Sequence, residues 1–392
     1  MNKKNLAIFS GEPSLLEKFK RPSPLSKSDI IAAERVLKSG LLSKAGLGPE
    51  VNNFEKNFAK FHNCKFALSV SSGTTALHTA VRALEIGPGD EVLVSALTFI
   101  STASVVLQEG AQVIFVDINE KDFCIDTDDL IKKITKRTKA IIVVHLYGLP
   151  VNMGKILKIA KKYSLKIIED CAQAHGAIYN KGMVGTFGDL GCFSFYQTKN
   201  MTCGEGGMII TDNKKLYETC SILADHGRKS VKTRKYDYDR IGFNYHMTEL
   251  QAVIANSQLS RLKELNNERL KNANLYLTSL KGTPLIFQQR RSNSSHVYYV
   301  LTALLPTNWK KERNWFLRAM SKENCDLNQI YPIPLNKTSL FKESGQKCPK
   351  AEDVCDRLIN FYVNPGISEE TIKTICKATK KVLNFLQNKY AK

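Results

Sequence analysis

One lysine of this chain stands among neighbours that suggest chemistry rather than solubility. Lys199 lies within residues 194–203 (SFYQTKNMTC), just ahead of a glycine-rich run at residues 204–207 (GEGG). Because these neighbours are mostly apolar or neutral, we expect the amine to be partly desolvated, which favours its neutral form. A neutral lysine amine can attack an aldehyde and hold it as a Schiff base. For Lys199 alone, a half-buried lysine without a chemical role stays an open alternative.

A predicted strand that leads directly into a helix start offers an anion-binding site upstream of Lys199. Residues 67–77 (ALSVSSGTTAL) pass from an apolar run through small residues into a helical pattern. The backbone N–H groups of such a helix start, together with the Thr74 hydroxyl, would bind a phosphate. Gly73 would let the backbone approach that phosphate closely. An ordinary helix cap is the competing interpretation of these small hydroxyl residues.

Polar and aromatic residues follow three other predicted strands. Asp170 closes an apolar run in residues 167–176 (IIEDCAQAHG), and Gln173 follows shortly after it. Ser194 ends another strand, and Phe99 follows a third, where its ring could stack on a flat ligand. Ligand contacts in open α/β sheets gather at the carboxyl ends of the strands. A helix cap at Asp170 and a core position for Phe99 are the structural alternatives.

Together these residues supply the parts of a pyridoxal 5'-phosphate site. Lys199 would hold the aldehyde, Asp170 would keep the pyridine nitrogen protonated, and Gln173 would reach the ring oxygen. The phosphate would lie against the helix start and Ser194. Each part alone is weak evidence, but their arrival at successive strand ends of one sheet is hard to explain by chance.

The elements that must position these residues alternate between strands and helices. We predict strands at residues 66–70, 91–95, 112–116, 140–146, 165–169, 192–195 and 208–211, with helices between many of them. Such alternation predicts an α/β fold with a mostly parallel sheet between helices. After the middle of the chain the pattern changes to strands at 296–304 and 327–331 and helices at 309–320 and 369–386. We therefore predict an N-terminal arm with a large domain over residues 1–265 and a small C-terminal α+β domain over residues 266–392.

Composition narrows the class of protein. The 392 residues carry a formal net charge of +20, which is spread along the chain and is densest at residues 228–235. Aromatic residues are not interleaved with that cluster, so we do not expect a nucleic-acid partner. A solvated surface is the favoured explanation of the excess charge, and attraction of an acidic small molecule is the alternative. No apolar run is long enough to cross a membrane, and neither a secretory signal nor zinc-type cysteine spacing is apparent. We expect a cytoplasmic protein with free thiols and no metal.

The motifs above resemble those of the DegT/DnrJ/EryC1/StrS family of sugar aminotransferases, which are pyridoxal phosphate enzymes of fold type I. The resemblance rests most on Ser-Phe-x-x-x-Lys with Gly-Glu-Gly-Gly, on Glu-Asp-x-Ala-Gln-Ala-His-Gly and on residues 144–148 (VHLYG). It implies a homodimer with shared active sites. It also assigns roles residue by residue: Schiff base to Lys199, ring nitrogen to Asp170, ring oxygen to Gln173, ring stacking to Phe99, phosphate to Gly73, Thr74 and Ser194, and the partner subunit's phosphate to Asn244.

The resemblance implies transfer of an amino group from an amino acid, L-glutamate, to a keto-sugar linked to a nucleotide, in amino-sugar and polysaccharide biosynthesis. Lys199 argues against the dehydratases of this family, which have histidine at that position. Two alternatives stay open. The opening residues 6–13 (LAIFSGEP) are similar to those of enzymes that aminate ketocyclitols of the inosose type. The other alternative is a regulatory protein that keeps the cofactor fold without catalysis.

Three positions depart from the family pattern. His246 stands where the family usually has arginine, Leu149 where it often has glutamine, and Asn336 where it often has histidine. We expect these departures to bear on substrate identity rather than on the cofactor. Histidine in place of arginine would also make a basic contact weaker or pH-dependent.

Overall fold

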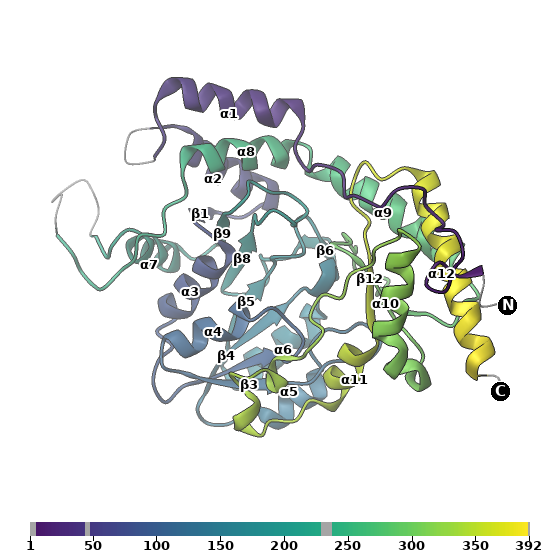
Figure 1. The fold of residues 1–392 in the computed structure, drawn as a ribbon. Coiled ribbons are helices and arrows are strands. Elements are labelled where there is room, and N and C mark those ends of the chain that lie inside the picture. The colour runs from purple at the N-terminus through teal and green to yellow at the C-terminus, as the bar shows by residue number, and fades with distance from the viewer. Residues whose placement is uncertain (1–4, 44–47, 229–236, 391–392) are drawn as a thin grey trace.

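Seven strands form the central sheet of the computed structural model, which describes residues 5–43, 48–228 and 237–390 (Figure 1). In spatial order they are β1 (Phe66–Val70), β9 (Gly207–Thr211), β8 (Leu190–Ser194), β5 (Lys166–Asp170), β4 (Thr138–Val144), β2 (Glu91–Ser95) and β3 (Gln112–Val116). The strands from β8 to β3 run parallel, whereas β9 pairs antiparallel with both β8 and β1. The predicted α/β fold with a mostly parallel sheet is confirmed.

Helices cover both faces of this sheet. Successive residues of a strand point to opposite sides, and here the residues on both sides are apolar and packed against helices. Val92 and Val94 of β2 belong to the buried cluster that holds α3, α4 and α7, while Leu93 between them packs with α5 and α6. Near β1 and β9, a third cluster joins the sheet to α2 and α8. The helices of this region are α1 (Lys27–Ser39), α2 (Glu50–His62), α3 (Gly73–Ala83), α4 (Ser101–Gln108), α5 (Thr127–Lys133), α6 (Met153–Tyr163), α7 (Lys214–Ala224) and α8 (Glu249–Ser260).

A smaller, antiparallel sheet lies in the C-terminal part of the chain. It consists of β10 (Ile286–Phe287), β11 (Leu301–Leu304) and β12 (Leu358–Phe361). A separate buried cluster unites it with α9 (Leu262–Ser279), α10 (Arg313–Lys322) and α12 (Glu369–Tyr390), and Leu6 of the N-terminal segment belongs to the same cluster. The division at residue 265 falls within α9 and stays a prediction.

Two of the strands predicted in the C-terminal part are wrong in extent. Only residues 301–304 of the predicted strand 296–304 are a strand, because the chain bends at Tyr298, whose φ is 44°. The predicted strand at 327–331 is reduced to an isolated bridge between Asn328 and Asn360. Tyr331, with a φ of 67°, turns the chain there, and this left-handed backbone is incompatible with a continuing strand.

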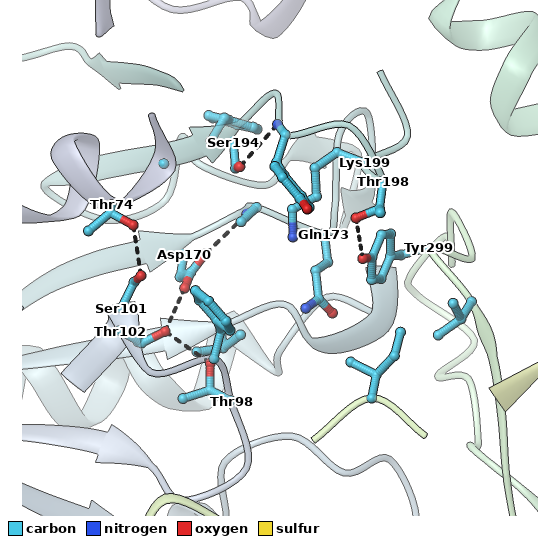
Figure 2. A pocket seen from close by; sticks show the side chains of 18 of the residues that line it. Thr74, Thr98, Ser101, Thr102, Asp170, Gln173, Ser194, Thr198, Lys199 and Tyr299 are labelled. Atoms are coloured by element: carbon cyan, nitrogen blue, oxygen red, sulfur yellow. Dashed lines mark hydrogen bonds between the residues drawn. The ribbon is translucent and has the colours of Figure 1, made fainter. Parts of the chain in front are cut away.

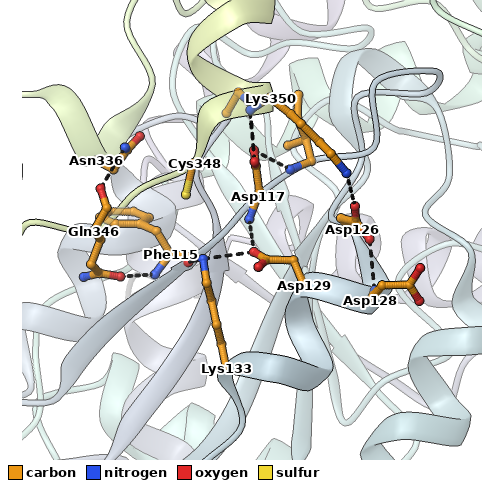
Figure 3. A network of polar contacts seen from close by, with 12 residues as sticks. Phe115, Asp117, Asp126, Asp128, Asp129, Lys133, Asn336, Gln346, Cys348 and Lys350 are labelled. Atoms are coloured by element: carbon orange, nitrogen blue, oxygen red, sulfur yellow. Dashed lines mark hydrogen bonds and ion pairs between the residues drawn. The ribbon is translucent and has the colours of Figure 1, made fainter.

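A polar network ties α11 (Pro349–Arg357) to β3 at the edge of the large sheet (Figure 3). Gln346 extends that edge, because its Oε1 accepts from the Phe115 N–H at 2.7 Å and its Nε2 donates to the Val113 carbonyl at 3.0 Å. The carboxylate of Asp117, which directly follows β3, accepts from the first-turn N–H groups of Lys350 and Ala351 at 3.0 and 2.8 Å. The start of α11 is thereby capped by a residue distant in sequence.

Composition also led to expectations about membrane spans, the cysteines and the basic cluster. None of the helices in the described ranges combines the length and hydrophobicity needed to cross a membrane. All ten cysteines are free thiols, as expected. Residues 229–235 of the basic cluster lie outside the described ranges.

Candidate active site

The carboxyl ends of the large sheet's central strands open into a cavity of about 530 Å³. Asp170 ends β5, Ser194 ends β8, and Phe99 follows β2, so parallel strands deliver all three to one edge of the sheet. Figure 2 shows the side chains of Lys199, Asp170 and Gln173 directed into the same space. Seven of the eight residues predicted from sequence line this cavity: Gly73, Thr74, Phe99, Asp170, Gln173, Ser194 and Lys199.

Lys199 is half-buried in the loop that follows β8. Its Nζ lies 4.9 Å from the centre of the Tyr299 ring, a distance at which the face of an aromatic ring attracts a cation. The Tyr299 hydroxyl lies 2.8 Å from Thr198 Oγ1, next to Lys199 in sequence. Tyr299 is held in turn by its N–H, which donates to the Tyr147 carbonyl at 2.9 Å. The amine is therefore positioned by a residue from the C-terminal part of the chain.

Asp170 is a buried carboxylate with a defined set of donors. Its Oδ1 accepts from the Ala172 N–H at 3.1 Å, and its Oδ2 accepts from Thr102 Oγ1 at 2.8 Å. Thr102 Oγ1 in turn lies 2.9 Å from Thr98 Oγ1, as Figure 2 shows. Burial raises the pKa of Asp170, although both hydrogen bonds and the positive charge of Lys199 oppose that rise. A cationic N–H group placed in the cavity would stabilise the ionised form of this carboxylate.

The first turn of α3 forms a tight wall where it meets the end of β8. A Cβ on Gly73 would lie 2.6 Å from Ser194 Cβ, so only glycine fits between the helix and the strand. Ser72 caps the helix through Thr75, which confirms the capping interpretation for this pair. The amides of Gly73 and Thr74 are first-turn donors without an acceptor inside the helix, and their positive helix end faces the cavity.

Gln173 has a fixed orientation. Its Oε1 accepts from the Tyr147 N–H at 2.7 Å, and its Nε2 donates to the Tyr331 hydroxyl at 2.6 Å. Because the amide carries two N–H donors, one remains for a ligand in the cavity. Phe99 is 54% exposed at the cavity wall, with its ring centre 6.4 Å from that of Tyr331.

Asn244 is the one predicted site residue that the structure does not bring to the cavity. It is exposed and forms a bridge with Asp225 beyond the end of α7. The three departures from the family pattern also lie outside the cavity lining. Leu149 is fully buried in the core, Asn336 donates to the Gln346 carbonyl and to Glu352, and His246 Nε2 lies 3.2 Å from Asp225 Oδ1. Core packing therefore accounts for Leu149, and hydrogen bonds within this chain account for Asn336.

The residues at the cavity fit a phosphorylated pyridine aldehyde. A cationic partner would stabilise the buried carboxylate of Asp170, whose pKa is raised by burial, and the amine of Lys199 projects into the same space. The start of α3, which packs closely on β8 at Gly73, presents first-turn N–H groups that can donate to a phosphate. The cavity also falls in the size range of small-molecule sites, about 300–1,000 Å³. The donor set therefore suits pyridoxal phosphate.

Sequence reasoning missed the residues that hold the predicted ones in place. Tyr299 contacts Lys199, Tyr331 contacts Gln173, and Thr102 contacts Asp170. Arg21, from the N-terminal segment, also lines the cavity. For Tyr331 a local signal is present, since two prolines follow it closely in residues 331–335 (YPIPL) and indicate a turn. For Tyr299 and Arg21 no local pattern distinguishes them from other residues of their types.

One family model and several known proteins match this chain over most of its length. The model of the DegT/DnrJ/EryC1/StrS aminotransferase family matches residues 25–380. A relative from Acidithiobacillus ferrooxidans, UDP-N-acetyl-3-dehydro-alpha-D-glucosamine 3-aminotransferase, is 37% identical over 86% of this chain and 90% of its own length. GDP-perosamine synthase from Escherichia coli O157:H7 is 36% identical over 84% of this chain and 89% of its own.

Solved structures share the fold over almost the whole chain. An aminotransferase from Psychrobacter cryohalolentis superposes with a TM-score of 0.88 at 31% identity, covering 94% of this chain and 100% of that one. A Streptococcus pneumoniae protein described as a sugar aminotransferase, solved in its PLP form, gives a TM-score of 0.86 at 26% identity, covering 93% and 100%.

Proposed function

The chain belongs to the DegT/DnrJ/EryC1/StrS aminotransferase family, and we propose that it uses pyridoxal phosphate to move an amino group from L-glutamate to a keto-sugar linked to a nucleotide. The observation that carries this proposal is the convergence of Lys199, Asp170 and the start of α3 on one cavity. Two relatives with about the same identity are named for UDP- and GDP-linked sugars, which supports a nucleotide-linked acceptor but does not select the nucleotide. Amino-sugar biosynthesis, and from it polysaccharide biosynthesis, is the proposed context.

Lys199 carries two roles in this proposal. In the resting protein its Nζ would hold the aldehyde carbon of the cofactor, and the arriving amino donor would release it as a free amine. As a free amine it then moves a proton at the substrate carbon, first in the donor half of the reaction and again in the acceptor half. The bound cofactor supplies the electron sink for these bond changes. Tyr299 and Thr198 keep the amine at the correct side of the cavity.

The other cavity residues bind and orient. Asp170, whose carboxylate accepts a hydrogen bond from Thr102, would keep the ring nitrogen protonated through a buried charge-assisted hydrogen bond. Gln173 would donate its remaining N–H to the ring oxygen, and Phe99 would stack on the ring. Gly73, Thr74 and Ser194, at the positive end of α3, would hold the phosphate.

A homodimer with shared active sites is part of the proposal. Asn244 is exposed in this chain, which leaves its side chain available to reach the phosphate in a partner subunit. The exposed face of α1 carries Ile30, Ile31 and Leu37 at 60, 65 and 58% exposure, an apolar surface suited to a subunit contact. Light scattering of the purified protein should give twice the mass of one chain, and Asn244→Ala should weaken cofactor binding.

The test of the function is a glutamate-dependent amination assay. The purified protein should lose its near-visible absorbance on addition of L-glutamate and regain it on addition of a nucleotide-linked keto-sugar. Amination of inosose, but of no nucleotide-linked sugar, would establish the ketocyclitol alternative. A protein that binds no cofactor would instead support the regulatory alternative.

We also propose that the reaction takes place in the cytoplasm. The free state of all ten cysteines supports this location, because thiols persist in a reducing compartment. Fractionation of cells that express the tagged protein would test the location directly.

A further inference from the structure

We propose that a second, basic cavity beside Lys199 is a subsite for the anionic group of a substrate, a carboxylate or a phosphate, with Arg21 as its principal contact. This inference rests on the proposed function, because it extends the substrate that reacts at Lys199. The second cavity has a volume of about 800 Å³. It adjoins the first, and Arg21 and Lys199 both belong to the walls of each. A substrate bound at Lys199 can therefore extend into it.

The second cavity carries a clear excess of positive charge. Lys20, Arg21, Arg261 and Arg269 line it, whereas Glu268 contributes the only carboxylate among the described residues of its lining. Arg261 is already compensated, because its Nη2 pairs with both carboxylate oxygens of the buried Asp29, at 2.8 and 3.0 Å. The charges of Lys20, Arg21 and Arg269 have no carboxylate partner among the described residues.

Arg269 is the strongest sign that an anion belongs here. Its side chain is 3% exposed, and its Nη1 makes one long hydrogen bond, 3.4 Å, to the Tyr299 carbonyl. Its Nε has no hydrogen-bond partner in the described part of the chain. Burial of an unpaired guanidinium is costly, and an anion in the adjoining cavity would reduce that cost.

Arg21 is held in place by a small aromatic cluster. Its guanidinium carbon lies 5.2 Å from the centre of the Tyr362 ring, and Phe19 stacks on the same ring at 5.8 Å. The Phe19 N–H donates to the Asn324 carbonyl at 2.9 Å, which anchors this segment to the C-terminal part of the chain. Since the side chain is exposed toward both cavities and already oriented, little conformational entropy is lost when it binds an anion.

Two substrates of the proposed reaction carry suitable anions. The amino donor has carboxylates, and a nucleotide-linked sugar has a diphosphate; both match the planar fork of an arginine side chain. The shared chemistry is an oxyanion, and the experiment must separate the two sources.

The experiment compares Arg21→Gln with the wild-type holoenzyme and with Lys18→Gln. Lys18 lies on the same segment but pairs with Asp326 at 3.0 Å and lines neither cavity, so it is the matched control. One arm measures the loss of near-visible absorbance against L-glutamate concentration. The other measures binding of UDP, GDP and inorganic pyrophosphate by calorimetry. We expect Arg21→Gln to weaken the apparent affinity measured in one arm, for L-glutamate or for the nucleotides and pyrophosphate, about 10- to 100-fold. This is the usual effect of removing one hydrogen-bonded charge.

Weakening in the glutamate arm alone would identify a carboxylate subsite, and weakening in the calorimetric arm alone would identify a phosphate subsite. Arg21→Lys should restore part of the lost affinity, because it keeps the charge and loses the fork. Equal behaviour of Arg21→Gln and Lys18→Gln in both arms would overturn the subsite. A wild-type protein that neither reacts with L-glutamate nor binds the nucleotides would contradict the proposed function itself.

Discussion

The amine of Lys199 lies over the ring of Tyr299, with Nζ 4.9 Å from the ring centre, and the Tyr299 hydroxyl lies 2.8 Å from Thr198 Oγ1. The ring and the hydroxyl therefore act on the same loop in two different ways. The ring faces the amine, and the hydroxyl contacts the side chain of the preceding residue, Thr198. These two contributions can be separated by substitution.

We predict that Tyr299→Leu slows covalent attachment of pyridoxal phosphate to the apoprotein about fivefold, because loss of a cation–π contact of about 1 kcal/mol releases the amine. Tyr299→Phe keeps the ring and loses only the hydrogen bond, so its attachment rate should stay within about threefold of wild type. Stopped-flow absorbance at the near-visible band measures both rates. Equal rates for the two variants would show that the ring does not position Lys199.

Asp170 should make the stability of the apoprotein depend on pH. Burial raises its pKa in the folded state, so the folded protein holds this proton more tightly than the unfolded chain does. The stability that results is present below the ordinary aspartate pKa of about 3.9 and is lost as the pH rises through the folded pKa. Asp170→Asn should therefore melt at a higher temperature than wild type at neutral pH, with a difference that shrinks on acidification.

The same Asp170→Asn variant should bind pyridoxal phosphate about 10- to 100-fold more weakly, because the ring nitrogen loses its charged partner. Thr102→Val leaves the carboxylate in place and removes one of its hydrogen bonds, so it is the matched control and should lose affinity to a smaller extent. If the asparagine variant binds the cofactor as tightly as wild type, Asp170 does not contact the ring.

Much of the cofactor side of the site could be predicted from sequence. Asp170 and Ser194 end, and Phe99 follows, short and mostly apolar runs that indicate buried strands, and parallel strands bring their ends together. Lys199 could be recognised by its mostly apolar or neutral neighbours in sequence and by the glycine-rich run after it. The predicted bounds of these strands agree with the structure to within two residues.

The cavity residues Tyr331, Tyr299 and Arg21 could not be predicted, because they reach the cavity through irregular backbone. Tyr331 and Tyr298 both have left-handed φ values, 67° and 44°, at positions where the pattern of residues favours strands. Such bends depend on tertiary contacts, here the hydrogen bonds from Tyr299 and Val297 to the carbonyls of Tyr147 and Gly148. Arg21 arrives from a segment without regular structure, and its position depends on Phe19 and Tyr362.

The N-terminal segment that carries Arg21 should detach at low pH. Glu323 accepts from Ala7 N–H at 2.9 Å, Ser14 Oγ at 2.7 Å and Lys381 Nζ at 2.8 Å. Burial raises the pKa of Glu323, but these hydrogen bonds outweigh burial and hold it below its ordinary value. The stabilisation is thus present above the ordinary glutamate pKa of about 4.3 and is lost as the pH falls through the folded pKa.

Glu323→Gln should accordingly speed proteolysis of the segment before residue 20 at neutral pH by about tenfold, the equivalent of one charged hydrogen bond. Limited proteolysis followed by mass spectrometry gives the rate. The difference from wild type should vanish in acid, and a variant with the wild-type rate at neutral pH would show that Glu323 does not anchor the segment.

Asp117→Ala should destabilise the protein by about 1–2 kcal/mol, because the first-turn amides of α11 lose their acceptors. Asp128→Ala is the control, because this side chain is exposed and has no hydrogen bond or ion pair to α11 in the described part of the chain. The substitution should cost less than about 0.5 kcal/mol. Urea unfolding measures both variants. Equal midpoints for the two would contradict the capping of α11 across the network of Figure 3.

Lys199 is proposed to hold the cofactor covalently in the cavity lined by Asp170 and the start of α3. Reduction of the holoenzyme with borohydride makes the bond between lysine and cofactor permanent, and peptide mass spectrometry then locates it. We predict that the cofactor is found on the peptide that contains Lys199 and is absent from Lys199→Arg. Recovery of the cofactor on a different lysine, or an unlabelled Lys199 in a protein that still transaminates, would contradict the account.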